Sequence, residues 1–399
     1  MRKLEQQFRI EYGFPVYFGR HLLDPAEPLL ASIPARAGRR RHRLLCIIDS
    51  GLLAARPELR DELKRYAAHH AQDIQLCGPP LVIAGGEDCK LDRAVVDLIL
   101  DRIRAHRLCR QSFVLAIGGG AVLDAAGFAT AIAHRGLRLI RMPTTVLAQN
   151  DAGIGVKNGI NSMGRKNFIG AFAPPFAVLN DFNLLSTLPA RQMRSGMAEA
   201  VKVALIKDHD FFNYLFRHRR QLASFATACM EEMIYRCAAL HMHHIGSQGD
   251  PFEQGSARPL DFGHWSAHKL EEMTGGRLQH GEAVAVGCAL DTLYSLRAGM
   301  LPEHEQRQIF TLLADLGLPL YHPALHEVDI VEALHEFQEH LGGNLALTLL
   351  TGIGAREEMT DIDIPLMDRC RNELAHRYSE HCPSADLDNE VVHFLEGLN

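Results

Sequence analysis

The stretch SFVLAIGGGAVLDAAGFATAIAHRG, residues 112–136, constrains the fold of this chain more than any other part of its sequence. An apolar run of strand length leads into Gly118, Gly119 and Gly120, and an alanine-rich helix is expected to follow. The same strand-then-helix pattern recurs at 42–53 and 79–108, and a further strand is expected at 137–145. Alternating strands and helices are typical of a parallel sheet with helices on both faces. We therefore predict an α/β fold for the first part of the chain.

The second part of the chain is predicted to be mainly helical. Apolar residues recur at helical spacing at 195–216, 227–246 and 281–299, and NLALTLLTGIG (344–354) carries the main strand signal there. The change in character follows PPFAVLNDFNLL, so we place the boundary between an α/β domain, 1–185, and a helical domain, 186–399.

Composition and charge exclude several classes of function. The net charge of −6 argues against a nucleic-acid surface, and the one basic run, RAGRRRHR (36–43), is short and is interpreted as a solvated loop. No apolar run approaches the length of a membrane span, and the first residues lack the apolar core of a signal peptide. Nine scattered cysteines without a CxxC pair are typical of reduced thiols. We expect a cytoplasmic protein that binds neither nucleic acid nor membrane.

The three consecutive glycines predict either a phosphate-binding loop or a tight turn. Glycines between a strand and a helix let the backbone approach a pyrophosphate, and the helix N-terminus offers free N–H groups. The loop lacks both the GxGxxG spacing and the lysine of a Walker A motif. Asp49, Glu87 and Lys90 follow predicted strands and could bind ribose or adenine, although such a residue alone is more often a surface cap than a ligand.

The block RMPTTVLAQNDAGIGVKNGINSMGRKNFIGAF (141–172) places charged and amide side chains among glycines. A polar loop is one interpretation. Lysine side chains near a glycine-rich surface also suit a phosphorylated substrate, because each ammonium is a point charge with several donors. The next helix carries Glu199 and Lys202 three residues apart, on one face.

Three histidines and a glutamate lie in the otherwise small and apolar stretch LDFGHWSAHKLEEMTGGRLQHGEAVAVG (260–287). They are His264, His268, His280 and Glu282. A metal site is one explanation, and core or surface histidines are the other, since the chain has 22 histidines in all.

Taken together, the chain resembles the sugar phosphate cyclases, the superfamily of 3-dehydroquinate synthase and 2-epi-5-epi-valiolone synthase. The resemblance covers residues 45 to 355 and rests on motifs that occur in order: GGGAVLDAAGF, HRG, MPTTVLAQNDAGIGVK, RKNFIGAF, LSTLP, SGMAEAVK, DFGHWSAHKLE, HGEAVAVG and TGIG. It implies a dehydroquinate synthase-like fold, with an N-terminal nucleotide-binding α/β lobe, an all-α C-terminal metal lobe and the active site in the cleft between them.

The resemblance also implies specific site residues. The metal, Zn²⁺ or Co²⁺, would be bound by Glu199, His264 and His280, which leaves positions open for substrate oxygens. Glu282 would be a supporting or capping residue. Catalytic roles fall to Lys157, Lys202, Glu199, His268 and Asp261. The positions that match substrate contacts are Asp151, Lys157, Asn167, Lys202, Arg258, His268, Arg135 and His340. Those that match NAD contacts are Asp49, Glu87, Lys90, Gly119, Gly120, Asp124, Thr144, Thr145, Leu147, Asp151, Lys166 and Thr187.

The implied partners are a small sugar phosphate and a second copy of the chain. In the family the arginine that matches Arg135 reaches the substrate phosphate of the neighbouring subunit, so the resemblance implies a homodimer.

The sequence departs from dehydroquinate synthase where that family binds a substrate carboxylate. ARPLDFGH (257–264) is one residue shorter than the family pattern and has Asp261 in place of Asn. An upstream lysine is missing, and FQEHLGGNL, with His340, replaces a Lys-Lys pair. A buried carboxylate without cationic partners would be poorly satisfied. These features favour a neutral ketose phosphate such as sedoheptulose 7-phosphate, as in valiolone-type synthases.

Other readings stay open. Asn158 stands where the valiolone type is expected to have Thr, and HMHHIGSQGDPFEQ (241–254) matches neither group. Dehydroquinate synthase, or a cyclase with another sugar phosphate, is therefore an alternative. From a different class, an iron-type alcohol dehydrogenase would share the two-lobe design, NAD and a metal, but would not need lysines that bind phosphate. A non-catalytic protein that keeps the fold is a further alternative.

Overall fold

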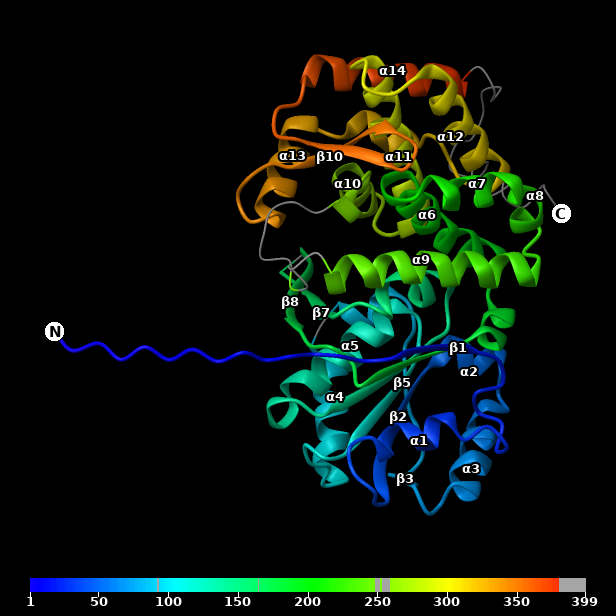
Figure 1. Ribbon diagram of the computed structural model, residues 1–399, viewed down its shortest axis with the longest axis vertical. Helices are drawn as coiled ribbons and strands as arrows, with labels where there is room; N and C mark the ends of the chain where they lie inside the picture. Colours follow the sequence, from blue (N-terminus) through cyan, green and yellow to red (C-terminus); the bar gives the residue numbers. More distant parts are fainter. Residues whose placement is uncertain (92, 164, 248–251, 253–258, 380–399) are drawn as a thin grey trace. The chain divides into compact units, whose positions relative to one another are not determined.

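The computed structural model describes residues 1–91, 93–163, 165–247, 252 and 259–379. Contacts divide the chain into two units (Figure 1). The first unit contains Met1–Thr144 and Gly155–Asn183, and the second contains Thr145–Ile154 and the chain from Leu184 onward. The segment Thr145–Ile154 therefore groups with the helical unit, although it lies within the first part of the sequence.

A seven-stranded sheet organises the first unit. Its spatial order is β1-β9-β6-β5-β2-β3, with β4 also paired to β2, and every pairing is parallel. The strands are β1 Val16–Gly19, β2 His42–Asp49, β3 Ile74–Leu76, β4 Leu81–Ile83, β5 Phe113–Gly118, β6 Arg138–Pro143 and β9 Ala177–Asp181. Every residue of β5 is buried, as expected for a continuous apolar run inside a parallel sheet.

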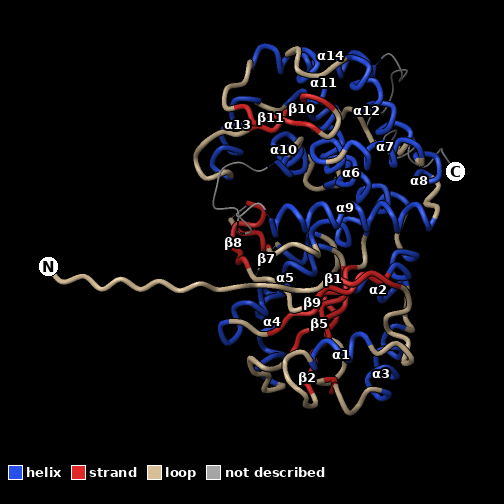
Figure 2. Tube along the Cα trace, viewed as in Figure 1, coloured by secondary structure: helices blue, strands red, loops and turns tan. Residues whose placement is uncertain are grey.

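Helices connect these strands (Figure 2). They are α1 Leu29–Ala35, α2 Ser50–Ala55, α3 Leu59–His69, α4 Ala94–Ala105 and α5 Gly120–Ile132, with short 3₁₀ turns η1 Glu87–Lys90 and η2 Ala133–Arg135. The alanine-rich α5 buries most of its length, because small side chains let it lie close to the strands. The predicted α/β fold is confirmed.

The polar block after β6 forms a β-hairpin. Strand β7, Lys157–Ser162, pairs antiparallel with β8, Arg165–Phe172. The buried guanidinium of Arg141 in β6 holds the start of the hairpin: it donates to the carbonyls of Gly155 (2.8 Å) and Lys157 (3.1 Å) and to Oδ1 of Asn158 (2.6 Å). Burial lowers the pKa of Arg141 to about 10, and the neighbouring Asp124 carboxylate acts in the opposite direction.

The hydrogen bonds of the Asn158 side chain explain why an asparagine stands where a threonine was expected. Its amide nitrogen donates to the carbonyls of Val156, Ala171 and Ala173 while its oxygen accepts from Arg141. A Cβ at Gly127 in α5 would lie 1.8 Å from that oxygen, so the glycine provides the space for the amide.

The second unit is built from helices around two long buried ones, α6 Ala190–Lys207 and α11 His280–Arg297. The others are α7 His209–Arg217, α8 Arg219–Ala223, α9 Thr227–Ser247, α10 His264–Met273, α12 Glu303–Asp315, α13 Ile330–His340 and α14 Ile364–Ser379. Short helical turns are η3 Ala148–Ala152, η4 Phe182–Thr187, η5 Pro259–Asp261 and η6 Pro323–Glu327.

The strand signal in NLALTLLTGIG forms one antiparallel pair in this unit, β10 Leu347–Gly352 with β11 Ala355–Met359. No helix in the described part of the chain is both long enough and apolar enough to cross a bilayer.

The role of Arg141 generates a stability prediction. Arg141→Met keeps much of the side-chain volume but leaves two carbonyls and the Asn158 amide oxygen without their donor. We expect the free energy of unfolding to fall by about 3 kcal/mol, since each buried acceptor loses its partner. Urea unfolding of the variant against the wild type measures this. Arg165→Met, which changes an exposed arginine of β8, should shift the midpoint little, and an equal loss in both variants would contradict the assignment.

Candidate active site

Glu199 and Lys202 form a buried ion pair on α6. Their side chains are 1% and 3% exposed, and Lys202 Nζ lies 2.5 Å from Glu199 Oε2. Burial disfavours the charged form of each group, but their mutual attraction outweighs it. The pKa of Glu199 is therefore lowered well below its usual value, aided by His280 and His264, and the pKa of Lys202 is raised. Both groups are charged near neutral pH.

Two histidines from other helices meet the same carboxylate. His264 begins α10 and His280 begins α11. Their Nε2 atoms lie 3.6 Å and 3.3 Å from Glu199 Oε1. One ligand atom from each of the three residues lies within 4.8 Å of the other two. The predicted trio is therefore brought together, although its members come from three helices.

The far side of each imidazole is held by an acceptor. Nδ1 of His264 lies 3.1 Å from the carbonyl oxygen of Phe262, and Nδ1 of His280 lies 3.3 Å from Oε2 of Glu271. A proton on Nδ1 of His264 satisfies its contact and leaves Nε2 with a lone pair directed towards Glu199. Burial opposes a charge on His280, but Glu271 and Glu199 raise its pKa to about 10, so this ring carries protons on both nitrogens, and a metal bound at Nε2 would replace one of them. Such outer hydrogen bonds orient metal-binding histidines. Sequence analysis did not single out Glu271. Its position on the same helix, seven residues after His264, is the signal that could have identified it.

The donor set fits a divalent metal ion. Two imidazole nitrogens and one carboxylate suit Zn²⁺ or Co²⁺. Within the described ranges, neither Glu199 oxygen has a hydrogen-bond partner of good geometry, although Lys202 and the two histidines surround it. A cation at this point would compensate the buried carboxylate. Burial, with the Lys202 charge, lowers the pKa of His264 to about 3, so this imidazole is neutral and available as a ligand.

Further predicted residues surround this trio. His268 is exposed on α10, one turn after His264, with the two ring centroids 5.4 Å apart. Asp151 in η3 lies 3.1 Å from Nδ1 of His241. Asp151 and Asp261 both act to raise the pKa of Lys202, which places them within electrostatic reach of its ammonium. His241 was missed, because three clustered histidines in α9 gave no reason to single it out.

Glu282 serves as a cap. It forms a capping box with Gln279 at the start of α11 and an ion pair with Arg191 (2.6 Å). The expected supporting or capping role is confirmed, and the residue helps to set where α11, and hence His280, begins.

The second group of predicted residues lies at the carboxyl edge of the parallel sheet in the first unit. Asp49 ends β2, Gly118 ends β5, and Thr144 follows β6 and donates its N–H to the Gly118 carbonyl (3.0 Å). Asp49 accepts from the N–H of Gly51 (2.7 Å), and a Cβ at Gly85 would lie 2.4 Å from the same carboxylate oxygen. This edge of an open α/β sheet is where ligands usually bind.

The glycine turn opens directly into α5. Gly119 caps the helix in an extended conformation and Gly120 is its first residue. The first turn of α5 therefore presents backbone N–H groups and the positive end of the helix dipole, which suits a phosphate group.

Predicted cofactor and substrate residues are connected beside this turn. Lys90, 3% exposed, donates to Asp124 Oδ2 (2.9 Å) and to the amide oxygen of Asn167. Asn161 donates to Glu87 Oε1 (2.8 Å) and accepts from the N–H of Asn167 (2.8 Å). Burial opposes the charge on Lys90, but Asp124 and Glu87 raise its pKa. The hairpin is thereby tied to η1 and α5.

The remaining predicted positions are less closely grouped. Thr145 Oγ1 accepts from the N–H of Ala148, Leu147 caps η3 and Thr187 ends η4. Lys157 begins β7 and Lys166 lies in β8, both exposed. His340 is the last residue of α13, and Arg258 lies outside the described residues.

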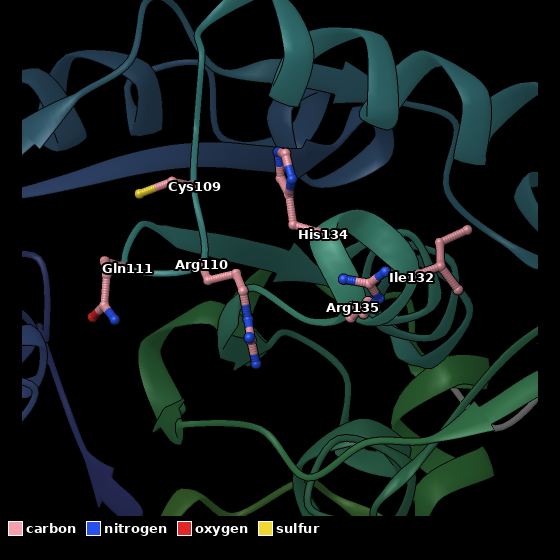
Figure 3. A pocket seen from close by; sticks show the side chains of 6 residues that line it. All are labelled: Cys109, Arg110, Gln111, Ile132, His134 and Arg135. Atoms are coloured by element: carbon pink, nitrogen blue, oxygen red, sulfur yellow. The ribbon is translucent and has the colours of Figure 1, made fainter.

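Arg135 is not brought to the carboxyl edge within one copy. It lies in η2, between the C-terminus of α5 and the start of β6, and therefore at the amino edge of the sheet. There it lines a cavity of about 680 Å³ with Cys109, Arg110, Gln111, Ile132 and His134 (Figure 3). His134 and Arg135 both have left-handed backbone conformations, with φ of 52° and 63°.

Comparison with known proteins identifies relatives. The family model for the 3-dehydroquinate synthase N-terminal region matches residues 80–195, and the C-terminal one matches 196–339. The 3-dehydroquinate synthase of Azotobacter vinelandii is 36% identical over 346 residues, 86% of this chain and 89% of the relative. The 2-epi-5-epi-valiolone synthase of Streptomyces glaucescens is 37% identical over 287 residues, 71% and 74% of the two chains.

A solved structure shares the fold over nearly the whole chain. The 2-epi-5-epi-valiolone synthase of Streptomyces hygroscopicus subsp. jinggangensis, which holds NAD⁺ and Zn²⁺, has a TM-score of 0.82 and 29% identity. The match covers 94% of this chain and 100% of that one.

The contact between Glu271 and His280 generates a prediction for metal affinity. Glu271→Ala removes the acceptor that orients the His280 ring, and we expect affinity for Co²⁺ or Zn²⁺ to fall by roughly 10- to 100-fold. Titration of metal-free protein with Co²⁺, followed by visible absorption, measures this. Glu272→Ala changes the adjacent, exposed carboxylate and serves as the matched control. Unchanged affinity in Glu271→Ala would contradict the orienting role.

Proposed function

Because the chain belongs to the 3-dehydroquinate synthase family, we propose that it is an NAD- and divalent-metal-dependent sugar phosphate cyclase acting on a neutral ketose phosphate, with sedoheptulose 7-phosphate favoured. The reaction eliminates phosphate and closes a carbocycle, as a carbon–oxygen lyase does. The observation that carries the substrate proposal is a carboxylate, Asp261, within electrostatic reach of Lys202 and His264.

Glu199, His264 and His280 would hold the metal. When bound, the cation supplies Lewis-acid polarisation of a substrate oxygen. The chain contributes the orientation of the ligands through Phe262 and Glu271.

The carboxyl edge of the parallel sheet would hold NAD. Gly119, Gly120 and the first turn of α5 suit its pyrophosphate, and Asp49 at the end of β2 suits a ribose hydroxyl. When bound, NAD supplies a temporary hydride acceptor, so that the overall reaction is redox-neutral. Lys90 and Asp124 bring Asn167, a proposed substrate residue, against the proposed cofactor residues.

Two lysines, Lys157 and Lys202, and Arg135 would bind the phosphate of the substrate. Lys157 and Lys202 are cationic groups that can donate to phosphate oxygens, and His268 is exposed beside the metal trio. The phosphate of the substrate can itself accept the proton during elimination, so the chain does not need a dedicated base for that step. Glu199, together with Asp151 and Asp261, raises the pKa of Lys202 and keeps it protonated.

The charge around Lys202 favours a substrate without a carboxylate. Burial raises the pKa of Glu358 in β11, and Asp261 adds to that shift. Two acidic groups, Asp261 and Glu358, therefore lie within electrostatic reach of each other, and Asp261 is also within reach of Lys202. A substrate carboxylate would be repelled here, whereas hydroxyl groups can donate hydrogen bonds to carboxylates.

A direct assay tests the substrate. Purified protein with NAD⁺ and Co²⁺ or Zn²⁺ should release phosphate from sedoheptulose 7-phosphate, and not from 3-deoxy-arabino-heptulosonate 7-phosphate, without accumulating NADH. Release from the second compound would identify a 3-dehydroquinate synthase. Release from neither would point to another sugar phosphate. Net NADH formation with simple alcohols would instead indicate an alcohol dehydrogenase.

A mixing experiment tests whether Arg135 acts on the site of a second copy. Arg135→Ala and Glu199→Ala should each be inactive alone. If Arg135 acts across copies, mixed dimers contain one intact site, and an equimolar mixture should regain about one quarter of wild-type activity after subunit exchange. The rate of phosphate release measures it. A mixture that stays inactive although mass spectrometry detects mixed dimers would show that Arg135 acts within its own chain.

A further inference from the structure

The carboxylate of Asp291, in the middle of α11, is fully buried and binds two N–H groups from the start of α10. Its Oδ2 accepts from the backbone N–H of Gly263 (3.0 Å), and its Oδ1 accepts from the indole N–H of Trp265 (2.9 Å). Burial raises the pKa of Asp291 to about 7, and these two donors act against that rise. The donors belong to the residues directly before and after His264, so Asp291 holds the chain on both sides of a proposed metal ligand.

One peptide unit connects Asp291 to the imidazole of His264. The N–H of Gly263 and the carbonyl of Phe262 belong to the same peptide, which is planar, and in a trans peptide these two groups point in opposite directions. Asp291 holds the N–H end, and the carbonyl end lies 3.1 Å from Nδ1 of His264, whose proton it accepts. The direction of the N–H therefore fixes the direction of the acceptor that orients the ring.

The turn before α10 is also packed directly on α11. Gly263 has φ of 75°, and a Cβ there would lie 2.6 Å from the backbone nitrogen of Cys288. A Cβ at Gly287 would lie 1.9 Å from the Gly263 carbonyl oxygen. Residues 287, 288 and 291 lie on one face of α11, and His280 is the first residue of the same helix. One helix thus carries one histidine and holds the turn that carries the other.

The two histidines are held by a carboxylate in different ways. Nδ1 of His280 contacts Glu271 directly, whereas Nδ1 of His264 contacts a carbonyl whose peptide N–H donates to Asp291. Hydrogen bonds in a chain polarise one another, so a peptide whose N–H binds a carboxylate offers a stronger acceptor at its oxygen. A stronger acceptor at Nδ1 raises the basicity of the ring as a metal ligand.

We propose that Asp291 is a positioning residue for the metal site, and that it acts on His264 through the peptide between Phe262 and Gly263. This proposal rests on the metal site of the proposed function. A carboxylate that only held α10 against α11 would contribute to the stability of the fold, but its loss would leave the metal affinity of the folded protein unchanged.

The first test replaces one acceptor of Asp291 with a donor. In Asp291→Asn the amide can accept from only one of the two N–H groups, and its NH₂ opposes the other. We expect the affinity of the metal-free full chain for Co²⁺, followed by visible absorption, to fall by roughly 10- to 100-fold. Thermal unfolding of each metal-free variant, followed by circular dichroism, separates loss of fold from loss of metal binding.

Ser295→Ala is the matched control for a purely structural loss. Ser295 is buried one turn further along α11, where it donates to the carbonyl of Asp291 (2.8 Å) and accepts from the N–H of Leu350 (3.0 Å). It makes neither of the two hydrogen bonds at the turn before α10. Its substitution should lower the Tm of the metal-free protein and leave the Co²⁺ affinity unchanged.

A second background tests the hydrogen bonds themselves. Trp265→Phe removes the indole N–H, so the new amide of Asp291→Asn can accept from Gly263 while no donor opposes its NH₂. In this background Asp291→Asn should lower the Co²⁺ affinity by no more than about threefold. Asp291→Leu in the same background leaves the Gly263 N–H without an acceptor and should lower the affinity by roughly tenfold or more.

The outcomes separate this proposal from the metal site on which it rests. Unchanged Co²⁺ affinity in folded Asp291→Asn, an equal loss in Ser295→Ala, or a loss that Trp265→Phe does not reduce would each overturn the positioning role and leave the metal site standing. A wild-type protein that binds no Co²⁺, or binds it equally well after Glu199→Ala, would overturn the metal site and this proposal with it.

Discussion

The buried carboxylate of Glu199 is the group on which the arrangement of the helical unit depends. A charge at 1% exposure must be compensated, and Lys202, His264 and His280 do this from three helices. Glycines allow these helices to approach: a Cβ at Gly281 would lie 2.0 Å from the Ser195 carbonyl oxygen, and one at Gly287 would lie 1.9 Å from the Gly263 carbonyl oxygen. The close packing of α6, α10 and α11 and the convergence of the proposed metal-binding side chains are therefore one structural feature.

The first unit places its chemistry at one edge of a parallel sheet for a different reason. Parallel strands bring all their carboxyl ends to the same edge, so Asp49, Gly118 and Thr144 become neighbours although they are far apart in the sequence. The hairpin β7–β8 then adds Asn167 to this edge through Lys90. Arg141 anchors the other end of the hairpin from within the sheet. A charge buried in β6 thus supports a group of polar residues at the site.

The opposite edge of the same unit carries Arg135, a residue that the resemblance assigns to substrate binding. It lies there with a left-handed backbone conformation, beside a cavity of about 680 Å³. This position is the reason for proposing that Arg135 acts on the site of a second copy, where an arginine would provide charge at a substrate.

Local sequence alone determined the strand-glycine-helix unit, the alternation that predicts a parallel sheet, and the residue types suited to a metal, because each depends on neighbours within a few turns. His264, His280 and Glu199 were identified through their motifs, and tertiary structure then brought their ligand atoms within 4.8 Å of one another. The sequence places Glu271 on the helix of His264, but it could not show that Glu271 contacts His280, that the polar block is a hairpin held by Arg141, or that Arg135 lies at the far edge of the sheet. Those facts depend on contacts between distant segments, which packing decides and local pattern does not contain.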